Sequence, residues 1–369
     1  MILFKTLNTR NRKMQKQIFS VLFGVIVLCF SAKAQEFSYQ TFSLSKDNVK
    51  ALSTEDKVIT PLLYVATSKD GILYAGSASF GRCLPLIDKD QEFAALKDGM
   101  LECNDLGLKV KNGVITEALT ATQNFALNLK QLDSMTLIQQ EVVYKRQKPK
   151  KSKAEDAFVR LRFHCAKDSK VQDLLQIMYG EKFDCNNAKA VFDKKAQDSL
   201  QKFLEASLEE DETNKANAIE KMLQFAPFEN YYKDSLYYFD SNLFVFSRGD
   251  YFYTGGAHGM YNASGVLLSK NGIVDLKTII DFDNPQLKDV LWNAYQQFLQ
   301  EKKTEGFADF KSFEVSKDVL VDYDGFVFLY QPYELMPYSY GVVKLKIPFA
   351  QMAEFGKFEN SPLSHLFAQ

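Results

Sequence analysis

The chain has 369 residues, with 45 basic and 46 acidic side chains and a net charge of −1. If residues 1–34 are removed as a signal peptide, 39 basic and 46 acidic side chains remain, and the charge becomes −7. An acidic chain is a poor candidate for binding nucleic acid or an anionic membrane, so we expect neutral or basic partners. The remaining 335 residues are long for one hydrophobic core and suggest two domains.

The N-terminus has the pattern of a secretory signal peptide. Residues 1–17 contain five basic side chains and no acid, residues 18–30 are almost continuously apolar, and residues 32–34 read Ala-Lys-Ala, a small-x-small cleavage pattern. The apolar run is shorter than the about 20 residues of a membrane-spanning helix, which leaves an uncleaved signal anchor as the second interpretation. Cys29 follows large apolar residues, so we reject lipidation. We expect cleavage after Ala34, a periplasmic or secreted protein, and no stable membrane insertion after cleavage.

Residues 35–147 are predicted to form a strand-rich N-terminal domain with little helix. A Ser-Lys-Asp-Gly turn at residues 68–71 and an Asn-Gly pair at residues 112–113 indicate two hairpins. The predicted strands are 62–67, 72–75, 108–110, 114–116 and 135–144, and a short helix is predicted at 92–101. The basic run at residues 145–153 is interpreted as a linker, with an acidic partner as the alternative reason for it.

Residues 154–369 are predicted to form a second domain, which begins with a strand and helices. Residues 158–165 alternate, which places Phe163 and its apolar neighbours on one face and His164 with two arginines on the other. Helices are predicted at 171–179, at 196–225 with a break near residues 211–214, and at 285–302 after an Asn cap.

The rest of this second domain is predicted to be mostly antiparallel sheet. Turn signals occur at residues 248–250, at Asn271-Gly272 and at Asp324-Gly325. The predicted strands are 236–239, 243–247, 251–253, 265–269, 273–276, 319–323, 326–330 and 342–347. The whole chain therefore reads as α+β, with antiparallel sheets, helices packed on one face and a strand-rich N-terminal part.

Four cysteines remain after removal of the signal peptide, and each neighbouring pair is separated by 20 positions. Four cysteines allow three pairings. We favour Cys83–Cys103 and Cys165–Cys185, because local loops close first, and each bridge would contribute roughly 3 kcal/mol. With no C-x-x-C motif and only three histidines, we expect no metal site and no cofactor.

Two motifs in the C-terminal third stand out as a candidate binding site. The first, Tyr-Thr-Gly-Gly-Ala-His-Gly at residues 253–259, implies backbone with positive φ at its glycines. The second, residues 331–341, holds aromatic and aliphatic side chains between two prolines, which would stiffen their display. The candidate binding residues are Gly255, Gly256, His258, Pro332, Tyr333, Glu334, Pro337, Tyr338 and Tyr340.

Each of these features also has a structural interpretation. His258 could act as a general base only with a carboxylate nearby, such as Asp250, Asp322 or Glu334, and we rank a turn-stabilising role ahead of catalysis. The tyrosines of residues 331–341 either anchor a partner or cover the edge of the core, and the sequence favours neither interpretation over the other. No serine-hydrolase elbow, zinc-protease motif or phosphate loop occurs, so no catalytic residue is assigned.

Residues 228–355, through both motifs and the Asp-Gly hairpin before an aromatic strand, resemble the RsiV-like extracellular domain family. This family includes the lysozyme-binding module of an anti-sigma factor and the C-terminal module of a peptidoglycan deacetylase. The resemblance implies binding of a lysozyme-like protein, with Pro332, Tyr333, Glu334, Pro337 and Tyr338 as the inserting loop. The residues Gly255, Gly256 and His258 would lie beside it.

The resemblance does not extend to the other activities of the family. Only about 17 residues precede the apolar run, so we expect no sigma-binding segment, and no carbohydrate-esterase segment is present. The leading hypothesis is an exported, non-enzymatic envelope protein that binds lysozyme-type hydrolases or peptidoglycan itself. The alternatives are a glycan hydrolase that uses His258 with a carboxylate, and a purely structural accessory module.

Overall fold

The computed structural model describes residues 34–53, 60–85, 95–104, 106–120, 123–146, 153, 155–206, 219, 221, 223–224 and 227–367. The predicted signal peptide up to residue 33, most of the basic run 145–153 and the predicted helical segment 207–218 lie outside these residues. Within the described part of the chain, no helix is long and apolar enough to cross a membrane.

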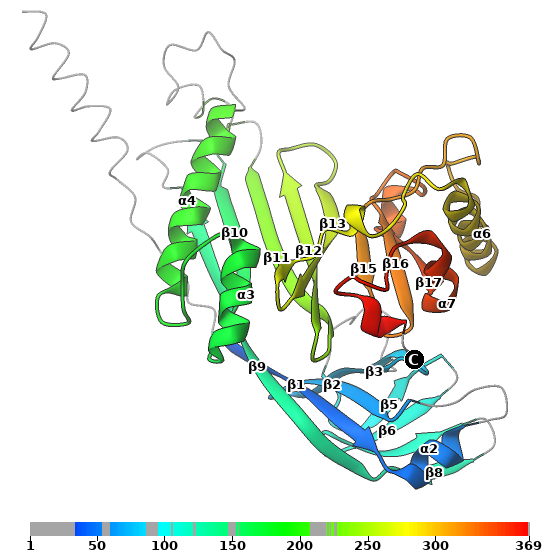
Figure 1. Cartoon of the computed structure of the whole chain (residues 1–369). Coiled ribbons are helices and arrows are strands. Elements are labelled where there is room, and N and C mark those ends of the chain that lie inside the picture. Colours follow the sequence, from blue (N-terminus) through cyan, green and yellow to red (C-terminus); the bar gives the residue numbers. More distant parts are fainter. Residues whose placement is uncertain are drawn as a thin grey trace, which may run out of the picture.

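The described strands form one sheet of fourteen and one of three, and the fold class is α+β, as predicted. The large sheet has the order β14-β13-β12-β11-β10-β9-β1-β2-β3-β4-β5-β6-β7-β8, and Figure 1 shows β1 to β8 bent below β10 to β13. Its strands are β1 (Gln35–Leu44), β2 (Leu62–Ser68), β3 (Gly71–Ser77), β4 (Gly81–Pro85), β5 (Gly99–Glu102), β6 (Gly107–Lys111), β7 (Val114–Leu119), β8 (Asn124–Ala126), β9 (Leu129–Lys145), β10 (Ala157–Ala166), β11 (Phe228–Phe239), β12 (Leu243–Tyr253), β13 (Met260–Ser269) and β14 (Gly272–Ile273).

The N-terminal part is strand-rich, and both predicted hairpins are present as β2–β3 and β6–β7. The helix predicted at 92–101 is wrong in its described part, where β5 begins at Gly99 with φ 135° and Leu96 pairs with Ile72. Such a φ favours glycine and interrupts a helix. The strands β1, β4, β5 and β8 and the helix α2 (Lys46–Leu52) were not predicted from the sequence.

The strand β9 joins the two parts of the sheet that the predicted linker separates in sequence. It is antiparallel to β1 along Leu129–Gln139 and antiparallel to β10 along Leu137–Lys145. The next pair, β10 and β11, is parallel, and a parallel pair needs a crossover connection. This connection contains the helices α3 (Ser169–Tyr179) and α4 (Ala188–Ala206), which lie over β10 in Figure 1.

The predicted alternation of β10 is confirmed for its apolar face and wrong for His164. Phe163 is buried and stacks on Phe192 of α4 with a centroid separation of 3.8 Å. His164 is only 1% exposed, and its Nδ1 lies 2.6 Å from Oδ1 of Asp234. The register of β10 with β11 ends at Arg162, so beyond that point the Asp234 side chain can reach the imidazole.

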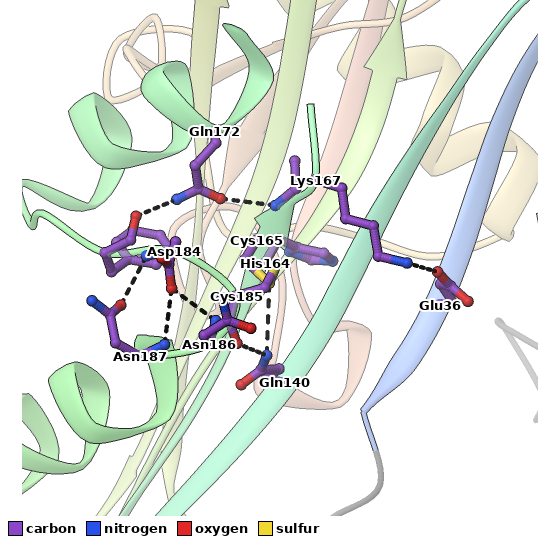
Figure 2. Close-up of a disulfide and its surroundings, with 12 residues drawn as sticks. Glu36, Gln140, His164, Cys165, Lys167, Gln172, Asp184, Cys185, Asn186 and Asn187 are labelled. Carbon is purple, nitrogen blue, oxygen red and sulfur yellow. Dashed lines mark hydrogen bonds and ion pairs between the residues drawn. A yellow bond between two sulfur atoms is a disulfide. The ribbon is translucent and has the colours of Figure 1, made fainter. Parts of the chain in front are cut away.

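Both predicted disulfides, Cys83–Cys103 and Cys165–Cys185, are present. Figure 2 shows the second, which ties the end of β10 to the loop between α3 and α4. Gln140 of β9 donates to the carbonyl oxygen of Cys185 at 3.1 Å, and Gln172 of α3 connects the Ala166 amide to the Phe183 carbonyl. This bridge therefore fixes the crossover helices against the sheet.

The C-terminal part adds a three-stranded antiparallel sheet and its helices. The predicted Asp-Gly hairpin, the strand after it and the Asn284-capped helix are confirmed. The break predicted at residues 248–250 is wrong, because β12 runs through Gly249 and pairs on both sides. These elements are β15 (Val319–Val321), β16 (Gly325–Tyr330), β17 (Val343–Pro348), α6 (Pro285–Lys302), α7 (Phe349–Met352) and the 3₁₀ turns Leu276–Thr278, Tyr338–Tyr340, Ala353–Phe355 and Ser364–Leu366.

A buried ion pair connects the N-terminal strands to the three-stranded sheet. Arg82 of β4 donates from Nε to Oδ1 of Asp322 at 3.2 Å, and the same carboxylate lies 2.9 Å from Nζ of Lys346. Although burial opposes ionisation, Arg82 and then Lys346 hold the pKa of Asp322 below its ordinary value. Close packing continues beside the pair, where the Tyr323 ring leaves no room for a Cβ at Gly76.

Candidate functional site

The first candidate motif forms the turn between β12 and β13. Gly255 and Gly256 have φ values of 101° and 100°, a region that L side chains rarely adopt, so glycine is needed at both positions. The hydroxyl of Tyr253 donates to the Gly256 carbonyl at 2.9 Å and closes the turn. His258 is exposed at its end, directly before β13 begins.

The second motif is a compact loop that follows β16, here called the tyrosine loop (residues 331–341). Gln331 clamps its start to β13, because the amide accepts from Ala263 N and donates to Ala263 O, both at 2.8 Å. The Glu334 carboxylate accepts a hydrogen bond from the backbone N–H of Gln331 at 2.7 Å, and this bond closes the loop on itself. Leu335 and Met336 are buried, so the loop has an apolar anchor beneath its exposed residues.

Tyr333 lies at the tip of the tyrosine loop in a strained conformation. Its φ of 73° is unusual for a bulky residue and costs of order 1–3 kcal/mol. The backbone holds it through a hydrogen bond from its own N–H to the Met336 carbonyl at 3.0 Å. Tyr333 is 49% exposed, although most large apolar side chains of the described residues are buried in the core. Strained, exposed residues of this type concentrate at functional sites.

The turn and the tyrosine loop meet at His258. Its Nε2 lies 3.1 Å from the Tyr333 hydroxyl, and its ring stacks on Tyr338 at 4.0 Å between centroids. Its Nδ1 lies 2.9 Å from the carbonyl oxygen of Gly259, which can only accept. In the neutral imidazole, Nδ1 therefore carries the proton and Nε2 accepts from the tyrosine hydroxyl.

The other predicted residues of the tyrosine loop have different surroundings. Pro332 is buried, Pro337 and Tyr338 are half-buried, and the Tyr338 ring also contacts Tyr261 edge to face. Tyr340 is 40% exposed, and its hydroxyl donates to Thr304 Oγ1 at 3.0 Å. The structure therefore exposes Tyr333, Glu334 and Tyr340 and uses the others mainly as support.

The tip of the tyrosine loop carries negative charge. Partial burial raises the pKa of Glu334, and repulsion from Asp318 and Glu314 raises it further. These three carboxylates lie close enough to influence one another, so a basic group of a partner would be attracted here.

The two remaining carboxylates considered as partners of His258 are engaged or placed elsewhere. Asp322 pairs with Arg82 and Lys346 in the contact between the two parts of the molecule. Asp250 lies on β12 opposite Tyr232 and Asn262, and burial raises its pKa. Among the described residues, no cluster of histidine, cysteine and carboxylate side chains could hold a metal ion.

Three residues that shape the site were not selected from the sequence. Gln331 stood inside the motif, but nothing in the motif indicated that it would bind the backbone of β13. Tyr261 fixes the end of the tyrosine loop by accepting from Val342 N at 2.9 Å. Gly341 is required beside it, because a Cβ there would lie 2.1 Å from the Tyr261 hydroxyl. A glycine four residues after a proline was the one available signal.

Comparison with known proteins gives one family match. Residues 269–350 match the model of a family described as a protein of unknown function, DUF3298. This segment contains the tyrosine loop, whereas the turn at residues 253–259 lies before it. No curated protein matches the chain.

Two solved structures of this family are similar to the chain. One, from Bacteroides fragilis, is 21% identical, covers 63% of this chain and 97% of its own, and has a TM-score of 0.46. The other, from Pseudomonas aeruginosa, is 18% identical, covers 59% of this chain and 94% of its own, and has a TM-score of 0.39. The segment that matches the family model, residues 269–350, includes α6 and all three strands of the small sheet.

Proposed function

We propose that this protein is an exported, RsiV-like cell-envelope protein that binds a lysozyme-type peptidoglycan hydrolase through the tyrosine loop and catalyses no reaction itself. The observation that carries the proposal is Tyr333, whose ring is 49% exposed on a strained backbone held by hydrogen bonds. A rigid tyrosine offers a large contact area and loses few rotamers on binding, which makes it a good anchor for a partner.

Charge supports a basic partner such as lysozyme. Asp318 and Glu314 lie close enough to Glu334 of the loop to raise its pKa by repulsion. The chain beyond residue 34 carries 39 basic and 46 acidic side chains, so its overall charge has the same sign. Such a surface accelerates encounter with a cationic protein, and added salt weakens the effect.

Export is supported by the two disulfides. Cys83–Cys103 and Cys165–Cys185 are consistent with an oxidising compartment outside the cytoplasm. Cleavage after Ala34 would leave Gln35, the first residue of β1, as the new N-terminus. This part of the proposal is tested by N-terminal sequencing of the protein recovered from its native host.

The alternative of a hydrolase that uses His258 has less support. Its two ring nitrogens contact the Gly259 carbonyl and the Tyr333 hydroxyl rather than a carboxylate. A general base needs such a partner to orient it and to stabilise its charge. Loss of glycan hydrolysis in His258→Ala, with the fold intact, would reverse this ranking.

Calorimetric titration into lysozyme at low salt tests the proposal directly. We expect saturable heat and inhibition of lysis. If the Tyr333 ring contributes about 2 kcal/mol to binding, Tyr333→Ala should lower the affinity for lysozyme about thirtyfold. Tyr232→Ala is the matched control, because Tyr232 is a similarly exposed tyrosine, at 46%, on β11 and outside both candidate motifs. The absence of heat and of inhibition would contradict the proposal, and sedimentation with insoluble peptidoglycan instead would assign the glycan as ligand.

A further inference from the structure

A second candidate site lies next to the tyrosine loop, at the C-terminal end of α6. The last turns of this helix and residues 303–309 surround an open depression of about 720 Å³. This volume is within the range of about 300–1,000 Å³ that is typical of ligand sites. Figure 1 shows α6 on the opposite side of the molecule from α3 and α4, at the outer surface.

The wall of the depression is held rigidly. The Leu335 carbonyl accepts from the Tyr295 hydroxyl at 2.8 Å and from Phe307 N at 2.9 Å. Gly306 lies against the same tyrosine, where a Cβ would be 1.5 Å from the hydroxyl oxygen. The segment after α6 is therefore fixed to the back of the tyrosine loop, and the depression is a preformed feature of the surface.

The lining combines apolar surface with two free amides. Trp292, Leu299 and Ala308 supply an indole ring and aliphatic groups. Gln296 and Gln300 line the same depression from positions one helical turn apart. Within the described part of the chain, neither side-chain amide has a protein hydrogen-bond partner, whereas Gln297 between them donates to Glu301 at 3.1 Å. Each amide can donate twice and accept, which suits ligands rich in hydroxyl and amide groups.

Exposed aromatic rings surround this lining. Phe307, between two lining residues, is 59% exposed, and Phe310 is 44% exposed and packs edge to face on Trp292 at 5.7 Å. Tyr340 of the tyrosine loop reaches the border through its bond to Thr304. Aromatic faces of this kind offer flat apolar surface beside polar groups.

The charges of the lining favour an uncharged ligand. Lys303 is the cation of the lining, and Glu305 and Asp309 are its carboxylates. Phosphate or nucleic acid would need a predominance of basic groups, which this site does not offer. A purely apolar ligand would leave both glutamine amides desolvated without partners. An uncharged sugar with amide substituents needs no excess of basic groups and offers hydrogen-bond partners to both glutamine amides.

We propose that this depression binds a short oligosaccharide of N-acetylated amino sugars. The ring faces stack on Trp292 and the neighbouring phenylalanines, the acetamido groups hydrogen-bond to Gln296 and Gln300, and their methyl groups contact Leu299 and Ala308. This inference goes beyond the proposed function and does not depend on it, because it involves a different surface and a different class of ligand.

The chain contains a single tryptophan, Trp292, so tryptophan fluorescence reports on the surroundings of this one lining residue. We expect tri-N-acetylchitotriose, titrated without lysozyme up to its solubility limit, to change the emission saturably and to give matching heat in calorimetry. Cellotriose, which has the same linkage without acetamido groups, is expected to bind more weakly by about fivefold or more. Equal binding of the two sugars would overturn the assignment of acetamido recognition.

Variants separate this site from the tyrosine loop. The double substitution Gln296→Ala, Gln300→Ala is expected to weaken sugar binding by about tenfold, and Gln297→Ala, on the same helix, to leave it unchanged. Tyr333→Ala should retain sugar binding even if it loses lysozyme. The absence of any emission change and heat, or unchanged affinity in the double variant, would overturn the inference whatever the outcome with lysozyme.

Discussion

Two clusters of tyrosines differ in what the fold does with them. Around Arg82, the guanidinium lies over the rings of Tyr74 and Tyr237 at 4.4 and 3.9 Å. Burial raises the pKa of each of these tyrosines to about 12, and every charge is paired. Around His258, two tyrosines also contact one nitrogen-bearing side chain, but Tyr333 is 49% exposed.

The comparison shows that residue type alone does not distinguish structure from recognition. The cluster around Arg82 joins two parts of the chain that are more than 200 residues apart, because Arg82 binds Asp322. Its rings are therefore needed for the fold. The cluster around His258 joins a turn and a loop that are also anchored by Gln331, so we expect the Tyr333 ring to add little to stability.

The largest effect is expected from breaking the buried pair. Asp322→Ala would leave the Arg82 guanidinium buried with its ionic partner removed, at a cost of about 3–5 kcal/mol in the free energy of unfolding. Denaturant titration measures this loss. Asp324→Ala is the matched control, since its carboxylate is more exposed and binds Lys346 near the surface, and less than about 1 kcal/mol is expected. Similar losses in the free energy of unfolding in both variants would contradict the distinction between the buried pair and the more exposed pair.

Acid should destabilise the fold through the buried cluster. The pKa of Asp322 is lowered in the folded protein, so its contribution to stability is present above the unfolded value of about 3.9 and is lost as pH falls through the folded value. We expect unfolding experiments below pH 4 to show a steep loss of stability. The loss should be shallower in Asp322→Asn, and an unchanged slope would show that other carboxylates, such as Asp240, dominate.

A smaller effect is expected where the tyrosine loop is clamped. Gln331→Ala removes both hydrogen bonds to Ala263, at a cost of about 1–2 kcal/mol. Hydrogen exchange of the Ala263 amide should accelerate together with the loop. The exposed Gln297→Ala serves as control, and an equal loss of stability there would mean that the clamp contributes nothing specific.

The smallest effect on stability, and the sharpest contrast, is expected at Tyr333. Because its φ is 73°, Tyr333→Gly relieves strain that Tyr333→Ala keeps, so the glycine variant should be the more stable of the two by about 1 kcal/mol. Both variants should have melting temperatures close to that of the wild type and should lose binding of the partner. A clear fall in melting temperature in both variants would favour the structural role for the ring.

Local signals predicted much of the fold. The Asp-Gly and Asn-Gly turns, the Asn284 cap and the 20-residue cysteine spacing each act over a short stretch of chain, and the corresponding elements are present. Errors arose where tertiary contacts decide. Gly249 resembles a turn residue but lies inside β12, where neighbouring strands pair with it on both sides.

The candidate site was predictable only as two separate motifs. Glycines with positive φ and a proline-bracketed run of tyrosines can be identified from local sequence. Their meeting at His258 depends on the start of the tyrosine loop lying beside β13, a contact between residues about 70 positions apart. No sequence motif indicated the depression beside α6, because its lining residues form one surface only after the segment that follows the helix folds back against it.

The position of β9 has a practical consequence for dividing this protein into fragments. A fragment of residues 154–369 would keep the entire DUF3298 segment but lose the strand that pairs with Phe158–Ala166. The hydrogen-bonding groups along that side of β10 would become an open edge, the type of surface that seeds intermolecular pairing. Recombinant fragments that begin at the basic run should therefore aggregate more readily than the whole chain, in which β9 covers this edge.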